Sequence, residues 1–167
     1  QVIVPSSVRP GEPFKVEIIS RDKYDNLSAS EDSVNLSLDG EVLDEMILYT
    51  GRVERVVTLD GPGIYRFDVS GTLSNPVRIT DTPNGPWWGD LHSHNAWSAD
   101  ALSSVADPDH YTYARDVSAL DYAALTNHVF GLEAGYWQKT QDWCESYNSP
   151  GEFVTILGFE GGIGYHL

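Results

Sequence analysis

The feature that most constrains this chain is a change of hydrophobic pattern near its midpoint. Residues 2–80 contain short β-rich runs separated by turn residues, whereas residues 87–160 contain apolar runs that alternate with segments of helical spacing. Sandwiches alternate strands with turns, and parallel sheets alternate strands with helices. The stretch "TDTPNGP", rich in Pro, Gly and Asn, separates the two patterns. We therefore expect two domains, residues 1–82 and residues 83–167.

The first half predicts an Ig-like β-sandwich. Runs such as "PFKVEIIS" and "IYRFDVS" alternate apolar and polar residues, so Phe14, Val16 and Ile18 share one strand face. Turn signals stand at Asp25-Asn26, Asp39-Gly40 and Gly61-Pro62-Gly63. The half contains no histidine and no helical pattern. We expect a structural or spacer domain, with glycan or partner binding as the alternative.

The second half predicts the order β-α-β-α-β. Its strands are "WWGDLHSH", "DYAALTNH" and "FVTILGFE", and its helices are "DHYTYARDVSAL" and "EAGYWQKTQDWCESYN". Spacing predicts that Tyr113, Val117 and Leu120 form the buried face of the first helix. Such units build a parallel sheet or a barrel, and both architectures collect functional residues at the carboxyl ends of the strands.

Metal-competent side chains stand at all three of these strand ends. His92 and His94 are two residues apart, so both side chains leave one strand face and can converge on a cation. A His-x-His pair alone is weak evidence, but His128 ends the second strand and Glu160 ends the third. The joint pattern predicts a metal site with these four residues as ligands.

Other candidates have competing interpretations. Asp100 can fold back to the site as a carboxylate ligand or remain an ordinary loop acid. His166 follows the glycine-rich "GGIGY" and is either a further ligand or part of a frayed terminus. His110 lies in the first turn of a predicted helix, where we expect a solvated imidazole. The tryptophans near the motifs are expected to pack in the core, with stacking on a sugar or base as the alternative.

Composition excludes some partners. The chain of 167 residues has a net charge of −15, which repels DNA, RNA and other polyanions. It has one cysteine, so an intrachain disulfide is impossible, and no run of about 18 apolar residues that would predict a membrane span. Gln1 in place of Met suggests a processed or trimmed terminus, which favours a periplasmic or secreted location over a cytoplasmic one.

Three motifs together resemble a known superfamily. "WGDLHSHNAWSADA", "LDYAALTNH" and "LGFEGG" followed by "GYH" are similar to the PHP (polymerase and histidinol phosphatase) superfamily, in particular its DUF3604 branch. The resemblance covers residues 87–167, and "SNPVRIT" is similar to the phrase that ends a β-sandwich-like segment in that branch. It implies a distorted (β/α)7 barrel with two or three ions of zinc, manganese or iron.

The resemblance also implies ligands by position: His92, His94, Asp100, His128, Glu160 and His166. Glu160 would bridge one metal held with the His-x-His pair and a second held with His166, while Asp100 and His128 would hold a third. Asn127 departs from the pattern, because the family usually has Asp there, so a neutral amide replaces a carboxylate beside the ligands.

The length of the second half limits these expectations. Barrels of this class need about 200 residues or more, and the family's later motifs lie beyond the position equivalent to Leu167. We expect the first part of a truncated barrel, completed by a missing C-terminal segment or by another chain.

The expected function is that of a metal-dependent hydrolase of phosphoesterase type, in which a metal-activated water attacks a small-molecule or glycan substrate. Two alternatives stay open. One is a carbohydrate-processing metalloenzyme. The other is a non-enzymatic binding or scaffold protein with an incomplete or degenerate barrel, inactive as this chain alone.

Overall fold

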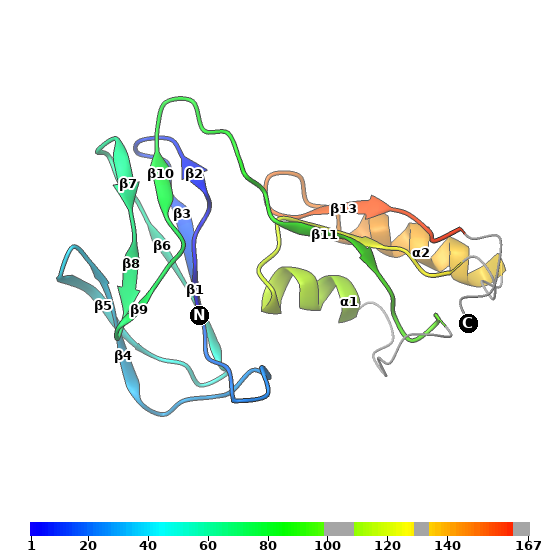
Figure 1. Ribbon diagram of the computed structural model, residues 1–167, viewed down its shortest axis with the longest axis horizontal. Coiled ribbons are helices and arrows are strands. Elements are labelled where there is room, and N and C mark those ends of the chain that lie inside the picture. The colour runs from blue at the N-terminus through cyan, green and yellow to red at the C-terminus, as the bar shows by residue number, and fades with distance from the viewer. Residues whose placement is uncertain (99–108, 129–133, 162–167) are drawn as a thin grey trace. The chain divides into compact units, whose positions relative to one another are not determined.

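The computed structural model describes residues 1–98, 109–128 and 134–161 (Figure 1). It divides into two compact parts, which we call the N-terminal unit (Gln1–Pro86) and the C-terminal unit (Trp87–Leu167). The chain is rich in β-strands and has few helices. Across the ranges described, no helix is both long and apolar enough to cross a membrane.

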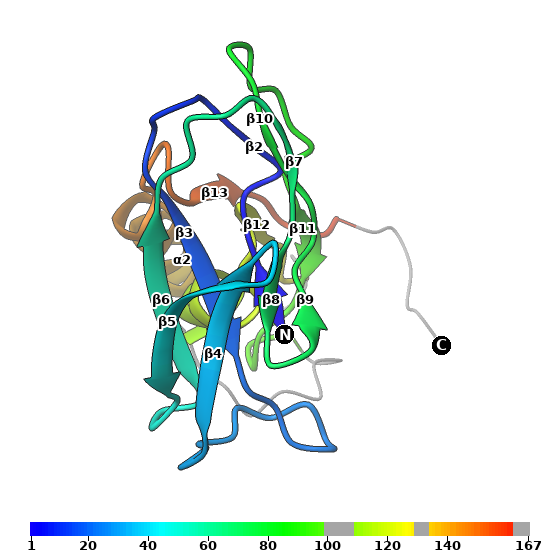
Figure 2. The same cartoon turned by 90° about the vertical axis from the view of Figure 1, so that its left-hand side faces the viewer.

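The N-terminal unit consists of strands alone, arranged in three small sheets (Figure 2). The first sheet has the order β1 (Val2–Ile3), β3 (Phe14–Ile19) and β6 (Arg52–Val57). The second has the order β2 (Ser7–Val8), β10 (Val77–Ile79) and β7 (Gly63–Tyr65). The third has the order β5 (Glu41–Ile47), β4 (Ser33–Leu38), β8 (Phe67–Val69) and β9 (Thr72–Leu73).

One hydrophobic core joins the three sheets. Val16, Leu36 and Val77 come from different sheets, are each at most 1% exposed and belong to the same packed cluster. The predicted face of β3 is confirmed, because Phe14, Val16 and Ile18 all lie in this core. The predicted β-rich fold of this half is therefore confirmed, and its inner faces hold the apolar alternation read from the sequence.

Two runs that look like single strands in the sequence each divide between two sheets. β1 pairs with β3, whereas β2 pairs with β10 in parallel; β7 pairs with β10, whereas β8 pairs with β4. At the first division, the side chain of Asn75 accepts a hydrogen bond from Val4 N (2.9 Å) and donates one to Val4 O (2.7 Å). The amide thus replaces a strand partner where the chain leaves one sheet for another.

The Asp39-Gly40 turn forms as predicted. Leu38 pairs with Glu41, which leaves two residues in the β4–β5 loop. Both have positive φ, 51° for Asp39 and 85° for Gly40, as a type I′ hairpin turn requires.

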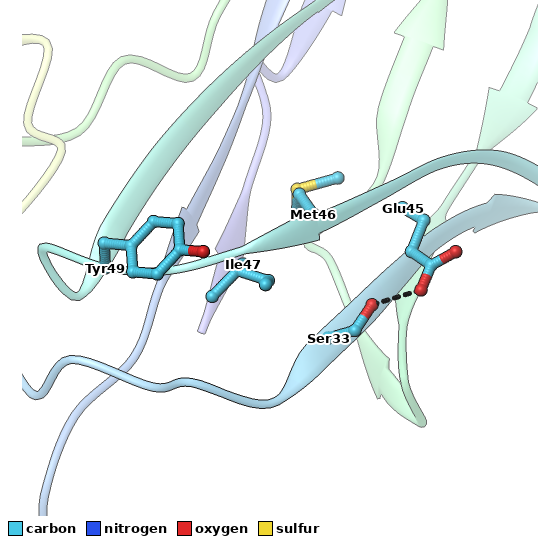
Figure 3. A pocket seen from close by; sticks show the side chains of 5 residues that line it. All are labelled: Ser33, Glu45, Met46, Ile47 and Tyr49. Atoms are coloured by element: carbon cyan, nitrogen blue, oxygen red, sulfur yellow. Dashed lines mark hydrogen bonds between the residues drawn. The ribbon is translucent and has the colours of Figure 1, made fainter.

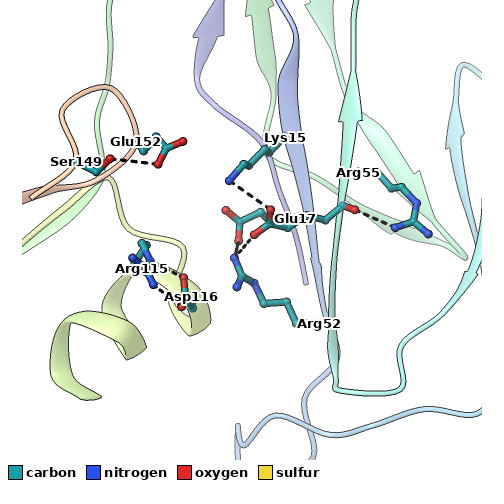
Figure 4. A network of polar contacts seen from close by, with 9 residues as sticks. Lys15, Glu17, Arg52, Arg55, Arg115, Asp116, Ser149 and Glu152 are labelled. Carbon is teal, nitrogen blue, oxygen red and sulfur yellow. Dashed lines mark hydrogen bonds and ion pairs between the residues drawn. The ribbon is translucent and has the colours of Figure 1, made fainter. Parts of the chain in front are cut away.

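An ion-pair network covers the outer side of β3 and β6 (Figure 4). Glu17 lies directly opposite Glu54, and Arg52 contacts both carboxylates, at 2.9 Å and 2.6 Å. Lys15 adds a contact of 3.3 Å to Glu54. Burial raises the pKa of Glu17, and the hydrogen bond and charge of Arg52 oppose that shift. The cations offset the repulsion between two facing acids.

The C-terminal unit has the predicted β-α-β-α-β order. The strands β11 (Gly89–Ser93), β12 (Tyr122–Leu125) and β13 (Val154–Leu157) form a parallel sheet in sequence order. The helical elements are α1 (Asp109–Thr112), the π-helix η1 (Tyr113–Val117) and α2 (Ala134–Tyr147). In the described residues the strands make an open sheet of three, not a closed barrel.

Aromatic side chains build the core of this unit. Tyr111 and Phe153 are fully buried, and Tyr111 also stacks on Tyr147 of α2, with ring centroids 5.8 Å apart. The predicted face of the first helix is wrong in part, since Tyr113 is 53% exposed while Tyr111 and Ala114 pack inward. The π-turn explains the difference, because an extra residue per turn shifts a face read at a period of 3.6.

Candidate metal centre

The strand register brings His128 and Glu160 side by side. β12 and β13 pair without a shift from Tyr122 opposite Val154 to Leu125 opposite Leu157. The same register continues past the strand ends to a parallel bridge between His128 and Glu160. Since parallel strands end at the same edge of a sheet, the pairing alone places the imidazole next to the carboxylate.

The His-x-His segment reaches this edge through a β-bulge. Asp90 pairs with Ala123 and Ser93 with Leu125, so two residues of β11, Leu91 and His92, lie opposite one residue of β12. A bulge changes the direction in which side chains leave a strand, and bulges are frequent beside active sites. Asp90 stabilises the bend by accepting a hydrogen bond from His92 N (2.9 Å).

Three imidazoles converge on one carboxylate oxygen. Glu160 Oε2 lies 3.0 Å from His92 Nε2, 2.9 Å from His94 Nε2 and 3.6 Å from His128 Nδ1. Ligand atoms of His92, His94 and Glu160 all lie within 4.8 Å of one another. His92 is 65% exposed, whereas the other three side chains are 16–22% exposed. The cluster is therefore open to solvent on one side.

This donor set fits a divalent metal ion. A carboxylate oxygen has about two lone pairs, too few to accept well-directed hydrogen bonds from three imidazoles. A cation shared by the histidines and Glu160 would use the same converging atoms as ligands. Imidazole with carboxylate suits zinc, iron or manganese. His92, His94 and Glu160 thus form a candidate metal-binding triad, and His128 lies beside it as a fourth donor.

Two predicted ligands lie outside the described residues. Asp100 and His166 fall in the ranges 99–108 and 162–167, so their predicted roles stay predictions.

His110 is not the solvated imidazole that its helical position predicts. Its Nε2 lies 2.9 Å from the hydroxyl of Ser93, the residue between the two histidines of β11. Ser93 Oγ also donates a hydrogen bond to Ala124 O (2.7 Å). Burial lowers the pKa of His110, and the nearby charge of Asp90 opposes the shift. No sequence signal indicated this contact, because Ser93 and His110 are joined only by the fold.

The tryptophans divide between packing and exposure. Trp97 is stacked between Tyr136 and Trp143 of α2, with centroids 4.4 Å and 4.6 Å away, as the core-packing prediction expects. Trp87 and Trp88 are 68% and 61% exposed, which contradicts that prediction for them. The Trp97 stack holds the loop after β11 against α2.

A hollow in the N-terminal unit offers no comparable chemistry. Its volume is about 380 Å³, and Figure 3 shows its lining: Ser33, Glu45, Met46, Ile47 and Tyr49. Its one carboxylate, that of Glu45, already accepts a hydrogen bond from Ser33. The histidine cluster of the C-terminal unit is the stronger candidate site.

Comparisons with known proteins do not assign this chain. No protein-family model and no curated protein matches it. A superoxide reductase (neelaredoxin) from Ignicoccus hospitalis and a variant of it are each 13% identical, with TM-scores of 0.32 and 0.33, and cover 48% of this chain and 79% and 78% of theirs. A carbohydrate acetylesterase from Xanthomonas citri is 11% identical, with a TM-score of 0.31, over 95% of this chain and 40% of its own length. TM-scores this low support no argument about fold or activity.

Proposed function

We propose that the C-terminal unit is the first part of a metal-dependent hydrolase of the PHP type, acting on phosphoesters. The observation that carries the proposal is the convergence of His92, His94 and His128 on a single oxygen of Glu160. The convergence occurs at the carboxyl edge of a parallel sheet, where α/β folds hold their ligands.

The two faces of the sheet support the barrel part of the proposal. Thr155 donates a hydrogen bond to Cys144 O of α2, so Val154 and Ile156 point to the opposite face. They are 40% and 39% exposed, although parallel sheets are normally covered on both faces. In a barrel this face would be the interior, covered by the remaining strands.

Each residue of the cluster has a defined task in this proposal. His92, His94 and Glu160 would hold a divalent cation, with His128 as an additional donor. When bound, such a cation supplies a Lewis acid that stabilises charge on a phosphoryl group and activates water. The exposed side of His92 leaves room for a substrate to approach. The net charge of −15 favours a small ester over a nucleic acid.

Metal retention is the first test. We expect on the order of one equivalent or more of transition metal in protein purified without chelator, because four donors converge. The double variant His92→Ala/His94→Ala and the variant Glu160→Gln should each retain less than about a tenth of an equivalent. Glu145→Gln, an exposed acid of α2, is the matched control and should retain the wild-type amount. Equal metal content in all four proteins, measured by elemental analysis, would overturn the ligand assignment.

Activity is the second test. Metal-loaded protein should hydrolyse a phosphomonoester or phosphodiester, and Glu160→Gln should not. Hydrolysis of acetylated or other glycan substrates alone would replace the phosphoester assignment by a carbohydrate-processing one. Metal binding without turnover of either class would support a binding role and reject the enzymatic one for this chain.

A further inference from the structure

Two buried asparagines lie directly beside the candidate ligands. Asn95 follows His94 and is 2% exposed, and Asn127 precedes His128 and is 3% exposed. They are among the few buried polar side chains in the described part of the C-terminal unit. Buried amides are costly unless they are hydrogen-bonded, so their partners show what they hold in place.

The two amides bond reciprocally. Asn95 N donates to Asn127 Oδ1 (3.0 Å), and Asn127 Nδ2 donates to Asn95 Oδ1 (2.8 Å). Asn95 Oδ1 accepts a second hydrogen bond from Trp97 N (2.9 Å). The pair therefore ties the loop after β11 to the end of β12, at the positions next to two ligands.

Backbone contacts extend this link to the other ligand-bearing segments. Asn127 O accepts a hydrogen bond from Glu160 N (3.1 Å). Ser98 N donates to Asn95 O (3.0 Å), and Ser98 Oγ accepts a hydrogen bond from His128 N (3.1 Å). The chain segments that carry His94, His128 and Glu160 are thus all bonded to this asparagine pair or to Ser98, which it holds.

We propose that Asn95 and Asn127 are positioning residues, which set the distance between the His94 and His128 segments and so tune metal affinity. The inference rests on the proposed metal site and adds to it the residues that hold its ligands in register. Partners that orient metal ligands affect affinity about 10–100-fold when changed.

The donors and acceptors of the pair make an asymmetric prediction. Asp at 127 would replace the donating Nδ2 by an oxygen that faces Asn95 Oδ1, and rotating the Asn95 amide would remove the acceptor of Trp97 N. Asp at 95 would keep an oxygen for both donors, and the nitrogen it loses, Asn95 Nδ2, makes no hydrogen bond among the described residues. Both changes are isosteric and add the same charge.

The test is a zinc titration of the full chain against a chromophoric chelator, with cobalt absorption spectra as a report of ligand geometry. Asn127→Asp should weaken zinc binding about 10–100-fold and alter the cobalt spectrum. Asn95→Asp should stay within about twofold of wild type, as for changes that break no interaction. Equal losses in the two variants would overturn the inference, because a general effect of buried charge would then suffice. Failure of the wild-type protein to bind zinc would instead reject the metal site itself.

A second set of variants covers the case in which Asn127→Asp does not fold, as judged by the near-ultraviolet signal of the Trp97 stack. Asn95→Ala and Asn127→Ala each remove the same reciprocal bonds. The double variant should therefore lose no more zinc affinity than the weaker single variant. Additive losses would show that the two amides act independently and would reject the pair as a unit.

Discussion

Ser93 has a position that neither of its neighbours shares. His92 and His94 both point to the candidate metal site, whereas Ser93 donates its proton to Ala124 O and lies within hydrogen-bond distance of His110 Nε2. Because the hydroxyl proton is already used, the imidazole must donate through Nε2. His110 is thus a structural donor that fixes the centre of the His-x-His segment, and Ser93 is not arranged as a nucleophile.

The lowered pKa of His110 predicts a pH-dependent stability. Because burial keeps the folded-state pKa below the ordinary value of 6.5, the unfolded chain takes up a proton first as the pH falls. Stability is complete above the unfolded pKa and decreases as the pH falls from there toward the folded pKa. The loss is at most about 1.4 kcal/mol per pH unit for one proton.

His110→Gln removes this proton but retains an N–H donor for Ser93. Urea unfolding of chelator-treated protein at about pH 7.5 and about pH 5.5 should show a smaller decrease in the free energy of unfolding for the variant. The chelator keeps metal release at the other histidines from contributing. An unchanged pH dependence would show that His110 is protonated alike in both states.

At the scale of elements, Gly89 sets the closeness of β11 and β12. A Cβ atom at Gly89 would lie 2.3 Å from Tyr122 Cδ2 and 2.4 Å from Tyr122 O. The backbone oxygen cannot move aside without breaking the strand pairing. Only glycine therefore allows the first strand to approach the second this closely.

Gly89→Ala should destabilise the C-terminal unit by about 1–3 kcal/mol, as overpacking of a core does. Gly135, in α2, is the matched control, since a Cβ there meets nothing within 4 Å. Gly135→Ala should be neutral or stabilising by up to about 1 kcal/mol, because alanine favours a helix. Urea unfolding followed by tryptophan fluorescence measures both, and a similar effect of the two substitutions would contradict the close approach.

The sequence predicted elements well where one period runs without interruption. The alternation of β3, the apolar run of β13 and the face of α2 with Thr140 buried at 3% are all read directly from spacing. It failed where geometry departs from the ideal period. The bulge before Ser93, the π-helix at 113–117 and the strand division at Arg66 each depend on contacts with distant segments.

The candidate site was predictable for a related reason. His128 and Glu160 follow their strands directly, so an unshifted parallel register suffices to place them together. The Asn95–Asn127 pair and the His110–Ser93 contact were not predicted as bonds, because amides, hydroxyls and single histidines carry no period. Tertiary pairing alone selects their partners.

At the scale of the whole molecule, the two units should unfold separately. Each has its own hydrophobic core, and all five tryptophans, Trp87, Trp88, Trp97, Trp137 and Trp143, lie in the C-terminal unit. Tryptophan fluorescence therefore reports that unit alone, whereas far-ultraviolet circular dichroism reports both.

Added zinc should move the fluorescence transition to higher temperature and leave the remaining dichroism transition in place. At a concentration of about 100 times Kd, binding stabilises a site by about 2.7 kcal/mol. Glu160→Gln should abolish the shift. A zinc-induced shift of both transitions in that variant would mean that the ion acts elsewhere on the chain.

The parallel pairing of β2 with β10 has a consequence for synthesis of the chain. Ser7 pairs with Arg78, so a strand made almost first waits for a partner made almost last in its unit. Such long-range pairing slows folding, and until it forms the edge of β2 is open to other strands. On the ribosome, the N-terminal unit can close only after residue 79 has emerged, when translation is about to enter the metal-binding half.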